Sequence, residues 1–480
     1  MSNNIDMKYD FSNASEIIST ENIENMIKKY SDKAKQKIND ILINEYNLDA
    51  NTAKRVEETI NSSVSSEMAT KYRFKEPFIT SSELGTEDRP HLILIRKYPD
   101  FLDWWFTAMV IPFYQSLGDT IGYKNGDWEF TDKDTNELIY EFIHLGGIND
   151  ISIVNWMSSD DTILYMATLG VLSKKIHNIN EFGEKLRTAY LDTLPLIETR
   201  HPGETTMRSL DVQKNIEWNK LPYSSRDIGA GAAMRSGCIG IFFPGKHNRK
   251  KLISLAIESS RITHNSATAI LGSIVAALFT AYALERVPIN HWPHKLLDLL
   301  RSDKIDKYME ESRPNEYKLF VRDKVIFIGQ WEKYVNRRFS GLKPKLDLKM
   351  MRNPVLRYDY LSKNFSKGCD MPGACGDDCV IFAYDALLES GPVVEKLVIY
   401  SILNPGDSDT VGSIAMSWFG AYYHSLKNQL ILESKFEELE FYDKLFNFYG
   451  INATKMAKVY YYDMYLNTAR KYLKQVKPKK

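Results

Sequence analysis

Two clusters of short oxygen-bearing side chains each stand directly before an apolar stretch of helical length. Ser159-Asp160-Asp161-Thr162 precedes Ile163 to Leu172, and Asp407-Ser408-Asp409-Thr410 precedes Val411 to Phe419. Asp and Ser are favoured helix N-caps, and capping is the commoner role of such a cluster taken singly. Carboxylate and hydroxyl oxygens are also the ligands that Mg²⁺, Mn²⁺ and Ca²⁺ prefer. Both clusters together are suited to one site for hard metal ions.

A glycine-bounded turn upstream carries two more acidic residues. Gly118, Asp119 and Gly122 end an apolar stretch, and Glu129 follows a few residues later. Glycines at this spacing allow a tight backbone turn with carboxylates at its rim. Asp119 can support a metal site from behind or cap a helix. Spacing alone favours a surface position for Glu129.

A run of small residues, Gly229-Ala230-Gly231-Ala232-Ala233, predicts a turn that opens a helix. Such a turn lets a diphosphate approach backbone N–H groups closely, and a helix N-terminus adds a favourable field for its charge. Tight helix packing explains the same residues equally well. His264 presents a similar choice, because a lone histidine near an apolar face is usually a hydrogen-bonded structural residue.

Taken in order, these motifs resemble those of the ADP-ribosylglycohydrolase family and look most similar to its ADP-ribosylarginine hydrolase branch. The resemblance covers residues 105 to 430 in collinear blocks. The segment that points to the arginine branch is Lys124-Asn125-Gly126-Asp127-Trp128-Glu129-Phe130. The other matching blocks are Leu145 to Gly147, Met157 to Thr162, Gly229 to Arg235, Glu258 to His264, Phe382 to Leu387 and Gly406 to Thr410.

The resemblance implies a hydrolase that releases ADP-ribose from a modified protein with the help of two Mg²⁺ ions, or of Mn²⁺. It assigns one ion to Ser159, Asp160, Asp161 and Asp409, and the other to Asp407, Asp409 and Thr410, so that Asp409 bridges. Two ions about 3.5 to 4 Å apart can orient ribose hydroxyls and lower the pKa of a water for attack. Asp160 or Asp161 is then the candidate proton acceptor, and a nearby carboxylate stabilises the oxocarbenium-like transition state.

The resemblance also implies roles for residues outside the two acidic clusters. Glu129 gates the site or orients the substrate, and Gly229, Ala230 and Gly231 cradle the diphosphate and ribose. His264 lies near the phosphates and binds them rather than transferring protons. Two segments depart from the family pattern, Asn265 to Ala267 and Lys367 to Asp378, so the contacts to the leaving group and to adenosine are left unassigned.

Three functions therefore compete. The first is hydrolysis of the N-glycosidic bond that joins ADP-ribose to a protein arginine, which the branch resemblance favours. The second is hydrolysis of serine-linked ADP-ribose or of O-acyl-ADP-ribose. The third is a catalytically silent, ADP-ribose-binding relative like the crystallin-like members, but the presence of all the metal-motif carboxylates argues against it.

The elements that must position these motifs are helices. Apolar residues predict helices in several segments, and alternating strand patterns are scarce. These segments are residues 101–113, 270–284, 296–300, 320–334, 379–388, 393–403 and 411–423. We therefore predict an all-α fold, and the resemblance implies a compact orthogonal helical bundle.

The first 100 residues differ in pattern from the rest of the chain. Apolar residues recur at helical spacing from Ile23 to Leu42 in a lysine-rich background, Val56 and Ile60 suggest a second short helix, and residues 62–99 are rich in turns. We predict a small helical extension over residues 1–100, of unassigned role, and a catalytic domain over residues 101–480. The pattern after Phe436 again predicts helix, with a tyrosine stripe at residues 460–465.

Composition narrows the partners and the compartment. The 62 basic and 62 acidic residues balance, so net charge indicates neither nucleic acid nor a membrane surface as a partner. The apolar run Ala267 to Leu284 approaches the length of a membrane span, but a buried helix explains it better. Four cysteines are too few for a disulfide scaffold and match no common zinc pattern. We expect ordinary reduced thiols and an intracellular protein, with the cytoplasm favoured.

Overall fold

The structure is a computed structural model of the chain. It describes residues 32, 35–40, 42–44, 49–59, 99–174, 176–345, 348–366, 368, 371–424, 432 and 434–445, with the backbone alone for 99–109 and 349. Contacts divide the chain into one unit of Met1–Met109 with Phe446–Lys480 and another of Val110–Leu445. The predicted division at residue 100 stays a prediction. The turn-rich segment 62–98 and the tyrosine stripe at 460–465 lie outside the described residues.

The described part of the first unit is helical. Residues 32, 35–40 and 42–44 are helical, and a second helix covers residues 50–59. Asp49 caps this second helix, because its carboxylate accepts the N–H groups of Asn51 and Thr52, both at 3.0 Å. Within the described residues helices are thus present where the apolar spacing predicted them, whereas residues 23–31 and Ile60 of that prediction lie outside the described part.

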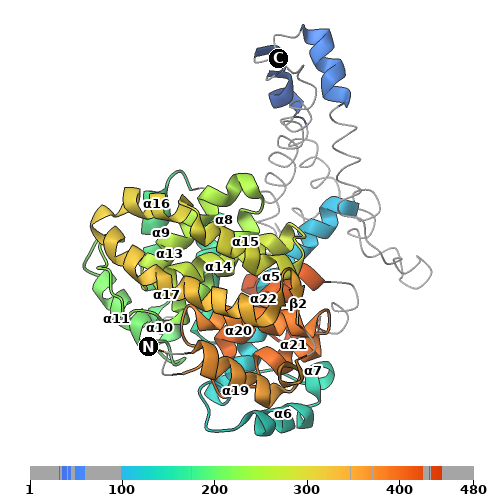
Figure 1. Cartoon of the computed structure of the whole chain (residues 1–480), viewed down its shortest axis with the longest axis vertical. Helices are drawn as coiled ribbons and strands as arrows, with labels where there is room; N and C mark the ends of the chain where they lie inside the picture. The colour runs from blue at the N-terminus through green and yellow to red at the C-terminus, as the bar shows by residue number, and fades with distance from the viewer. Residues whose placement is uncertain are drawn as a thin grey trace, which may run out of the picture. The chain divides into compact units, whose positions relative to one another are not determined.

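The second unit is a helical bundle, which confirms the predicted fold class (Figure 1). Its first half holds α5 (Pro99–Tyr123, shared with the first unit), η1 (Lys124–Gly126), α6 (Thr135–His144), α7 (Gly147–Asp150), α8 (Asp160–Ser173), α9 (Ile179–Leu191), α10 (Leu194–Ile197), α11 (Glu204–Gln213), η2 (Ala230–Ala232), α12 (Ala233–Phe242), η3 (Lys246–Asn248) and α13 (Arg249–Arg261). Its second half holds α14 (Ala267–Leu284), η4 (Ile289–His291), α15 (Trp292–Arg301), α16 (Lys304–Ser312), α17 (Pro314–Arg338), α18 (Lys349–Arg352), α19 (Pro354–Phe365), α20 (Asp378–Ser390), α21 (Val394–Ser401) and α22 (Ser408–Tyr423). The strands β1 (Phe339–Ser340) and β2 (Lys343–Pro344) pair antiparallel, with Phe339 opposite Pro344.

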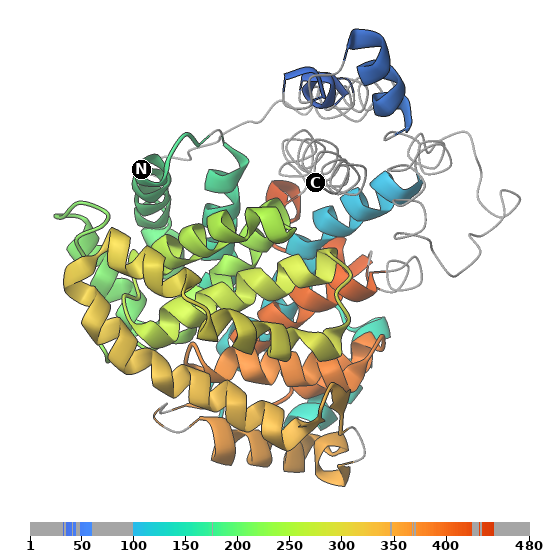
Figure 2. The same cartoon turned by 45° about the horizontal axis from the view of Figure 1, so that its top comes forward.

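Helix α14 forms the centre of the bundle. In the described part of the chain, α14 is the one helix that is both long enough and apolar enough to span a membrane. Each of its residues is buried against α12, α13, α17 or other parts of the structure. Ser266 caps it by accepting the Ala269 N–H at 3.2 Å. The structure therefore confirms the expected buried helix. In the turned view of Figure 2 the surrounding helices enclose this one on several sides.

Glycines let the helices that carry the acidic motifs come close together. A Cβ at Gly118 of α5 would collide with the Gly412 carbonyl of α22, and a Cβ at Gly122 would lie 2.6 Å from Asp409 Cα. Side chains at these positions would force α5 away from the N-terminus of α22. The glycines predicted to form a turn thus fix the crossing of two helices instead.

A buried charge network joins three further helices. Asp385 of α20 pairs with Arg338 of α17 at 2.7 Å and with Arg357 of α19 at 2.5 Å, and Tyr334 also donates to it. All four side chains are almost fully buried, so the charges must compensate one another. The Phe382 to Leu387 block, which matched the family, therefore contributes a structural anchor in the bundle.

The close crossing of α5 and α22 gives a stability prediction. We expect Gly118→Ala to lower the free energy of unfolding by about 1–3 kcal/mol, because the added methyl has no room against the α22 backbone. Gly329→Ala is the matched control, since Gly329 is exposed in α17 with no atom within 4 Å of its added methyl. That change should stabilise by up to about 1 kcal/mol. Thermal unfolding of both variants measures the contrast, and equal effects would contradict it.

Candidate active site

The two acidic clusters lie at the N-termini of α8 and α22, and these two helix ends meet. Ser159 caps α8 by accepting the Asp161 N–H at 3.1 Å, and Asp407 caps α22 by accepting the Thr410 N–H at 3.2 Å. Thr410 Oγ1 donates to Asp161 Oδ1 at 3.2 Å, and Ser159 lies near enough to Asp409 to offset part of the rise in pKa that burial causes there. Side chains about 250 residues apart in the sequence are therefore in direct contact.

The carboxylates of this junction are buried beside one another. Asp160, Asp161, Asp407 and Asp409 are each less than 9% exposed. Burial, and then the negative charge of Asp409, raise the pKa values of Asp160, Asp161 and Asp407 well above their usual range. Hydroxyls compensate part of this charge, since Ser413 Oγ donates to Asp161 Oδ2 at 3.0 Å. The cluster holds more negative charge than these hydroxyls offset.

Glu129 joins the cluster from a strained turn. Lys124, Asn125 and Phe130 have φ values of 42°, 58° and 48°, which only glycine adopts without cost. The Phe130 N–H donates to the Gly406 carbonyl at 3.1 Å, so the turn lies against the segment that leads into α22. One carboxylate oxygen each of Glu129, Asp407 and Asp409 lies within 4.8 Å of the other two. Spacing alone favoured a surface position for Glu129, whereas this turn directs it to Asp407 and Asp409.

The pKa of Glu129 reflects the same crowding. Burial, and then Asp409, Asp407 and Asp160, raise it to about 11. Carboxylates held this closely favour a bound cation, because a cation offsets their mutual repulsion. The donors here are carboxylate and hydroxyl oxygens, which suit hard divalent ions and fit the metal that the motifs predicted.

Asp119 supports the cluster from α5. Its carboxylate accepts the N–H of Ser159 at 3.1 and 3.2 Å and the N–H of Thr162 at 3.0 Å. Burial, and then the charge of Asp409, raise the pKa of Asp119 to about 7. The two roles left open for Asp119 are therefore combined, because it caps α8 and at the same time fixes the backbone behind the acidic cluster.

The small-residue turn lies next to a histidine. His264 Nε2 would be 3.1 Å from a Cβ at Gly229, and the His264 ring would collide with a Cβ at Gly231. The Ala230 N–H donates to the Ala374 carbonyl at 2.8 Å, so the protein itself engages this group. Both glycines are needed for the approach of the imidazole, which is the packing role that the sequence left open.

His264 is buried and uncharged. Burial, and then Arg235 and Arg208, lower its pKa to about 3. Its Nδ1 lies 2.9 Å from the Thr263 hydroxyl, which also accepts from Arg235 at 2.7 Å. Arg235 donates in addition to the Gly231 carbonyl at 2.6 Å, so it connects the turn to the histidine. A neutral imidazole can hydrogen-bond a ligand but adds no positive charge to the turn.

The loop before α20 connects the turn to the acidic cluster. The Ala374 carbonyl of this loop accepts the Ala230 N–H, and its Pro372 carbonyl accepts the Asp407 N–H at 2.9 Å. The charge of Arg235, next to the turn, lowers the pKa of Asp160 slightly against the larger effects that raise it. The predicted ligand turn and the predicted metal residues are thus neighbours in one region.

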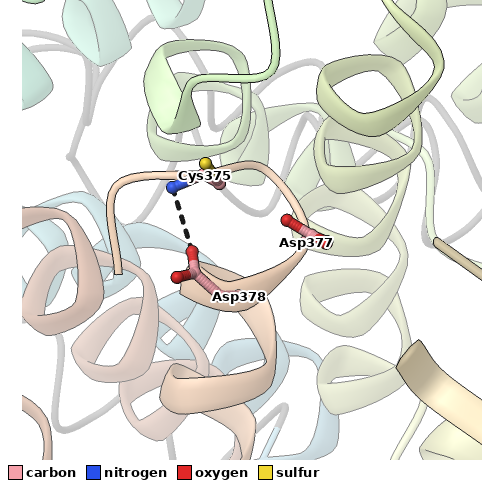
Figure 3. Close-up of side chains that lie close together, drawn as sticks. All are labelled: Cys375, Asp377 and Asp378. Atoms are coloured by element: carbon pink, nitrogen blue, oxygen red, sulfur yellow. Dashed lines mark hydrogen bonds between the residues drawn. The ribbon is translucent and has the colours of Figure 1, made fainter. Parts of the chain in front are cut away.

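The same loop holds a second group of potential ligands, Cys375, Asp377 and Asp378 (Figure 3). Both oxygens of Asp378 accept backbone N–H groups, from Gly373 and from Cys375 at 2.9 Å each. Cys375 is disulfide-bonded, with its partner outside the described residues. A sulfur in a disulfide cannot act as a thiolate ligand for a metal. Because both oxygens of Asp378 already accept N–H groups of the loop, we interpret this group as stabilising the loop.

The expectation of ordinary thiols was therefore wrong for Cys375. It is confirmed for Cys238 and Cys379, which are free and buried. A low cysteine count excludes a disulfide scaffold, but one local bond needs only two sulfurs at a suitable separation. Composition could not reveal that separation.

Comparison with known proteins identifies the relatives of this chain. Residues 115–435 match the family model described as ADP-ribosylglycohydrolase. A protein of Acanthamoeba polyphaga mimivirus named as an ADP-ribosyl glycohydrolase is 53% identical over 94% of this chain and 90% of its own length. The ADP-ribosylhydrolase ARH1 of Dictyostelium discoideum is 33% identical over 64% of this chain and 84% of its own length. A solved structure described as an ADP-ribosylglycohydrolase-related protein complex aligns with a TM-score of 0.45 at 16% identity, covering 75% of this chain and 98% of that one.

The raised pKa values predict how metal-free protein depends on pH. The pKa of Asp119 is about 7 in the folded protein against an ordinary value of 3.8, so its contribution to stability is present below about 4 and lost as pH rises through 7. Removing the charge of Asp409 should relieve this loss. In chelator we expect Asp409→Asn to unfold at a higher temperature than wild type, by a margin that grows from pH 5 to pH 8.

Two comparisons complete this test. Exposed Asp359 offers a control, and Asp359→Asn should show no such margin. Added Mg²⁺ should raise the unfolding temperature of wild type and leave that of Asp409→Asn almost unchanged. A margin independent of pH would contradict the crowding of charge at Asp409.

Proposed function

This chain belongs to the ADP-ribosylglycohydrolase family, and we propose that it removes ADP-ribose from protein by cleaving the N-glycosidic bond to arginine. The observation that carries the proposal is the junction of α8 and α22, where Thr410 and Ser413 of α22 donate to Asp161 of α8. It joins all the predicted metal residues in one buried cluster beside the Gly229 turn.

We assign the cluster to two Mg²⁺ ions, with Mn²⁺ as an alternative. Ser159, Asp160, Asp161 and Asp409 would hold one ion, and Asp407, Asp409 and Thr410 the other. When bound, such ions supply positive charge that orients ribose hydroxyls and lowers the pKa of a nearby water. The choice of divalent ions rests on the oxygen donors and on the excess of buried carboxylates.

Asp160 is our preferred acceptor of the water proton. Both oxygens of Asp161 already accept hydrogen bonds, from the hydroxyls of Thr410 and Ser413. No side chain in the described part of the chain donates a hydrogen bond to the Asp160 carboxylate. A carboxylate that accepts from no side chain keeps more lone pairs available for a proton, so Asp160 fits the role better than Asp161.

The remaining residues would bind and orient the substrate. Glu129, held at the edge of the cluster by its strained turn, would orient the ribose and stabilise positive charge at the anomeric carbon. Gly229 and Gly231 would bring the backbone close to the diphosphate, and neutral His264 would add a hydrogen bond. Ala230 would fix the turn through its bond to Ala374.

The arginine linkage rests on the segment Lys124 to Phe130. Asn125 in this segment adopts the left-handed conformation, and its side-chain oxygen accepts the Met157 N–H at 2.6 Å. The turn that carries Glu129 is thereby attached to the segment that carries Ser159. The residues after His264 support no choice of linkage, because Asn265 bonds to Leu221 and Glu316 and Ser266 caps α14.

Substitution of the cluster should abolish turnover. We expect Asp160→Asn and Asp409→Asn to lower kcat for release of ADP-ribose by at least about 100-fold, since each removes a charge that holds the ions or accepts the proton. Asp359→Asn should keep the wild-type rate. Full activity in both cluster variants would show that the reaction occurs elsewhere.

A paired substrate assay tests the linkage. Purified protein is incubated with arginine-linked and with serine-linked ADP-ribosylated protein, with Mg²⁺ or with chelator, and free ADP-ribose is measured. We expect release from arginine that stops with chelator and returns when Mg²⁺ is added. Release from serine alone, or from O-acyl-ADP-ribose, would favour the second function. Binding of ADP-ribose without any release would favour a silent relative.

A further inference from the structure

One ion pair holds both the N–H and the carbonyl of Ser158, directly before the acidic cluster. Arg200 Nη1 donates to the Ser158 carbonyl, and Glu440 Oε2 accepts the Ser158 N–H at 3.0 Å. Arg200 Nη1 and Nη2 donate to Glu440 Oε2 and Oε1, at 2.7 and 2.6 Å. The pair and the peptide form a closed ring, which we call the Ser158 clamp.

The arginine of the clamp is buried, and its glutamate is partly exposed. The side chain of Arg200 is 7% exposed and that of Glu440 is 28% exposed. Glu440, through its hydrogen bond, raises the pKa of Arg200 above its usual range, and the Arg200 guanidinium lies 5.7 Å from the Phe441 ring. Two-point guanidinium–carboxylate pairs with little exposure are stronger and more directional than surface pairs.

The segment that supplies Glu440 is anchored by two residues that precede Glu440. Phe436 packs at 5.2 Å from Tyr114 and 5.7 Å from Phe113 of α5. Glu438 accepts the Ile153 N–H at 2.7 Å, so a second acidic residue of the segment contacts the chain before Ser158. The position of Glu440 is therefore fixed independently of the peptide that it holds.

The Ser158 peptide transmits its position to the cluster. The Ser158 hydroxyl pairs with that of Thr120 at 2.9 Å, and the next residue is Ser159, whose hydroxyl caps α8 by accepting the Asp161 N–H at 3.1 Å. Asp160 follows at the first position of α8. A shift of the Ser158 backbone would therefore displace Ser159 and Asp160, and with them the N-terminus of α8.

We propose that Glu440 is a positioning residue which, together with Arg200, sets the affinity of the acidic cluster for divalent cations. The proposal rests on the metal-dependent function proposed above, and deepens it. Glu440 lies beyond residue 435, where the match to the family model ends, so the family pattern does not include it. The clamp gives this segment a part in forming the site without contact to ion or substrate.

Direct metal binding tests the clamp. Mn²⁺ binding to the full-length protein, without substrate, is followed by electron paramagnetic resonance, and Mg²⁺ binding by titration calorimetry. We expect Glu440→Gln, which keeps the shape and removes the charge, to weaken Mn²⁺ binding by about 10-fold or more. Glu437→Gln, a change of the same kind at an exposed position of the same segment, should bind like wild type.

Two further measurements separate positioning from general destabilisation. Because the effect acts through metal affinity, Glu440→Gln should need about 10-fold more Mn²⁺ for half-maximal rate and keep kcat within about twofold at saturation. Arg200→Lys keeps the charge but loses the two-point geometry, and should weaken binding similarly. The Mn²⁺ affinity of the double variant should be no lower than that of the single variant with the lower affinity, because both changes act through one ring of hydrogen bonds.

Wild-type Mn²⁺ affinity in Glu440→Gln and in Arg200→Lys would overturn the proposal, as would equal weakening in Glu437→Gln. A loss of kcat at saturating metal with unchanged affinity would also overturn it. Wild-type protein that binds Mn²⁺ but releases no ADP-ribose would count against the proposed function alone. Wild-type protein that binds no Mn²⁺ would overturn both.

Discussion

The mutual repulsion of buried carboxylates is the constraint on which this structure depends. Asp409 is the largest charge neighbour that raises the pKa values of Asp119, Asp160, Asp161 and Asp407, and it acts on Glu129 as well. Burying unpaired charge is costly unless hydrogen bonds or a cation offset it. The protein supplies hydroxyls from Thr410 and Ser413, and two helix N-termini, to offset part of that cost.

The rest of the bundle keeps these charges together. Gly118 and Gly122 let α5 lie against α22, and α5 in turn supplies Asp119 to the N-terminus of α8. The strained turn from Lys124 to Phe130 brings Glu129 to the same place, at a cost of about 1–3 kcal/mol for each residue in an unfavourable conformation. Strain of this kind persists only where surrounding contacts fix the backbone, and here the bonds of Phe130 to Gly406 and of Met157 to Asn125 do so.

Local sequence patterns predicted many of the helices and caps that form the site, but not the contacts between distant segments. Ser159 and Asp407 were predicted as helix caps and as metal residues, and they do cap α8 and α22, because capping depends only on neighbours in sequence. The apolar spacing predicted the helices of the bundle for the same reason. The bond between Ala230 and Ala374, the disulfide of Cys375 and the contact of Glu440 with Ser158 had no local signal, since each joins distant segments.

The sequence by itself determined the helices, their caps and, through the order of its motifs, the family. These follow from periodicity, capping chemistry and motif order, which are properties of neighbouring residues or of the chain read in sequence. Only the tertiary structure decided that Asp161 meets Thr410, that Asp119 caps a helix other than its own, and that a segment past the family motifs holds Ser158. Contacts across hundreds of residues depend on how helices pack, and packing is set by the shape of the whole core.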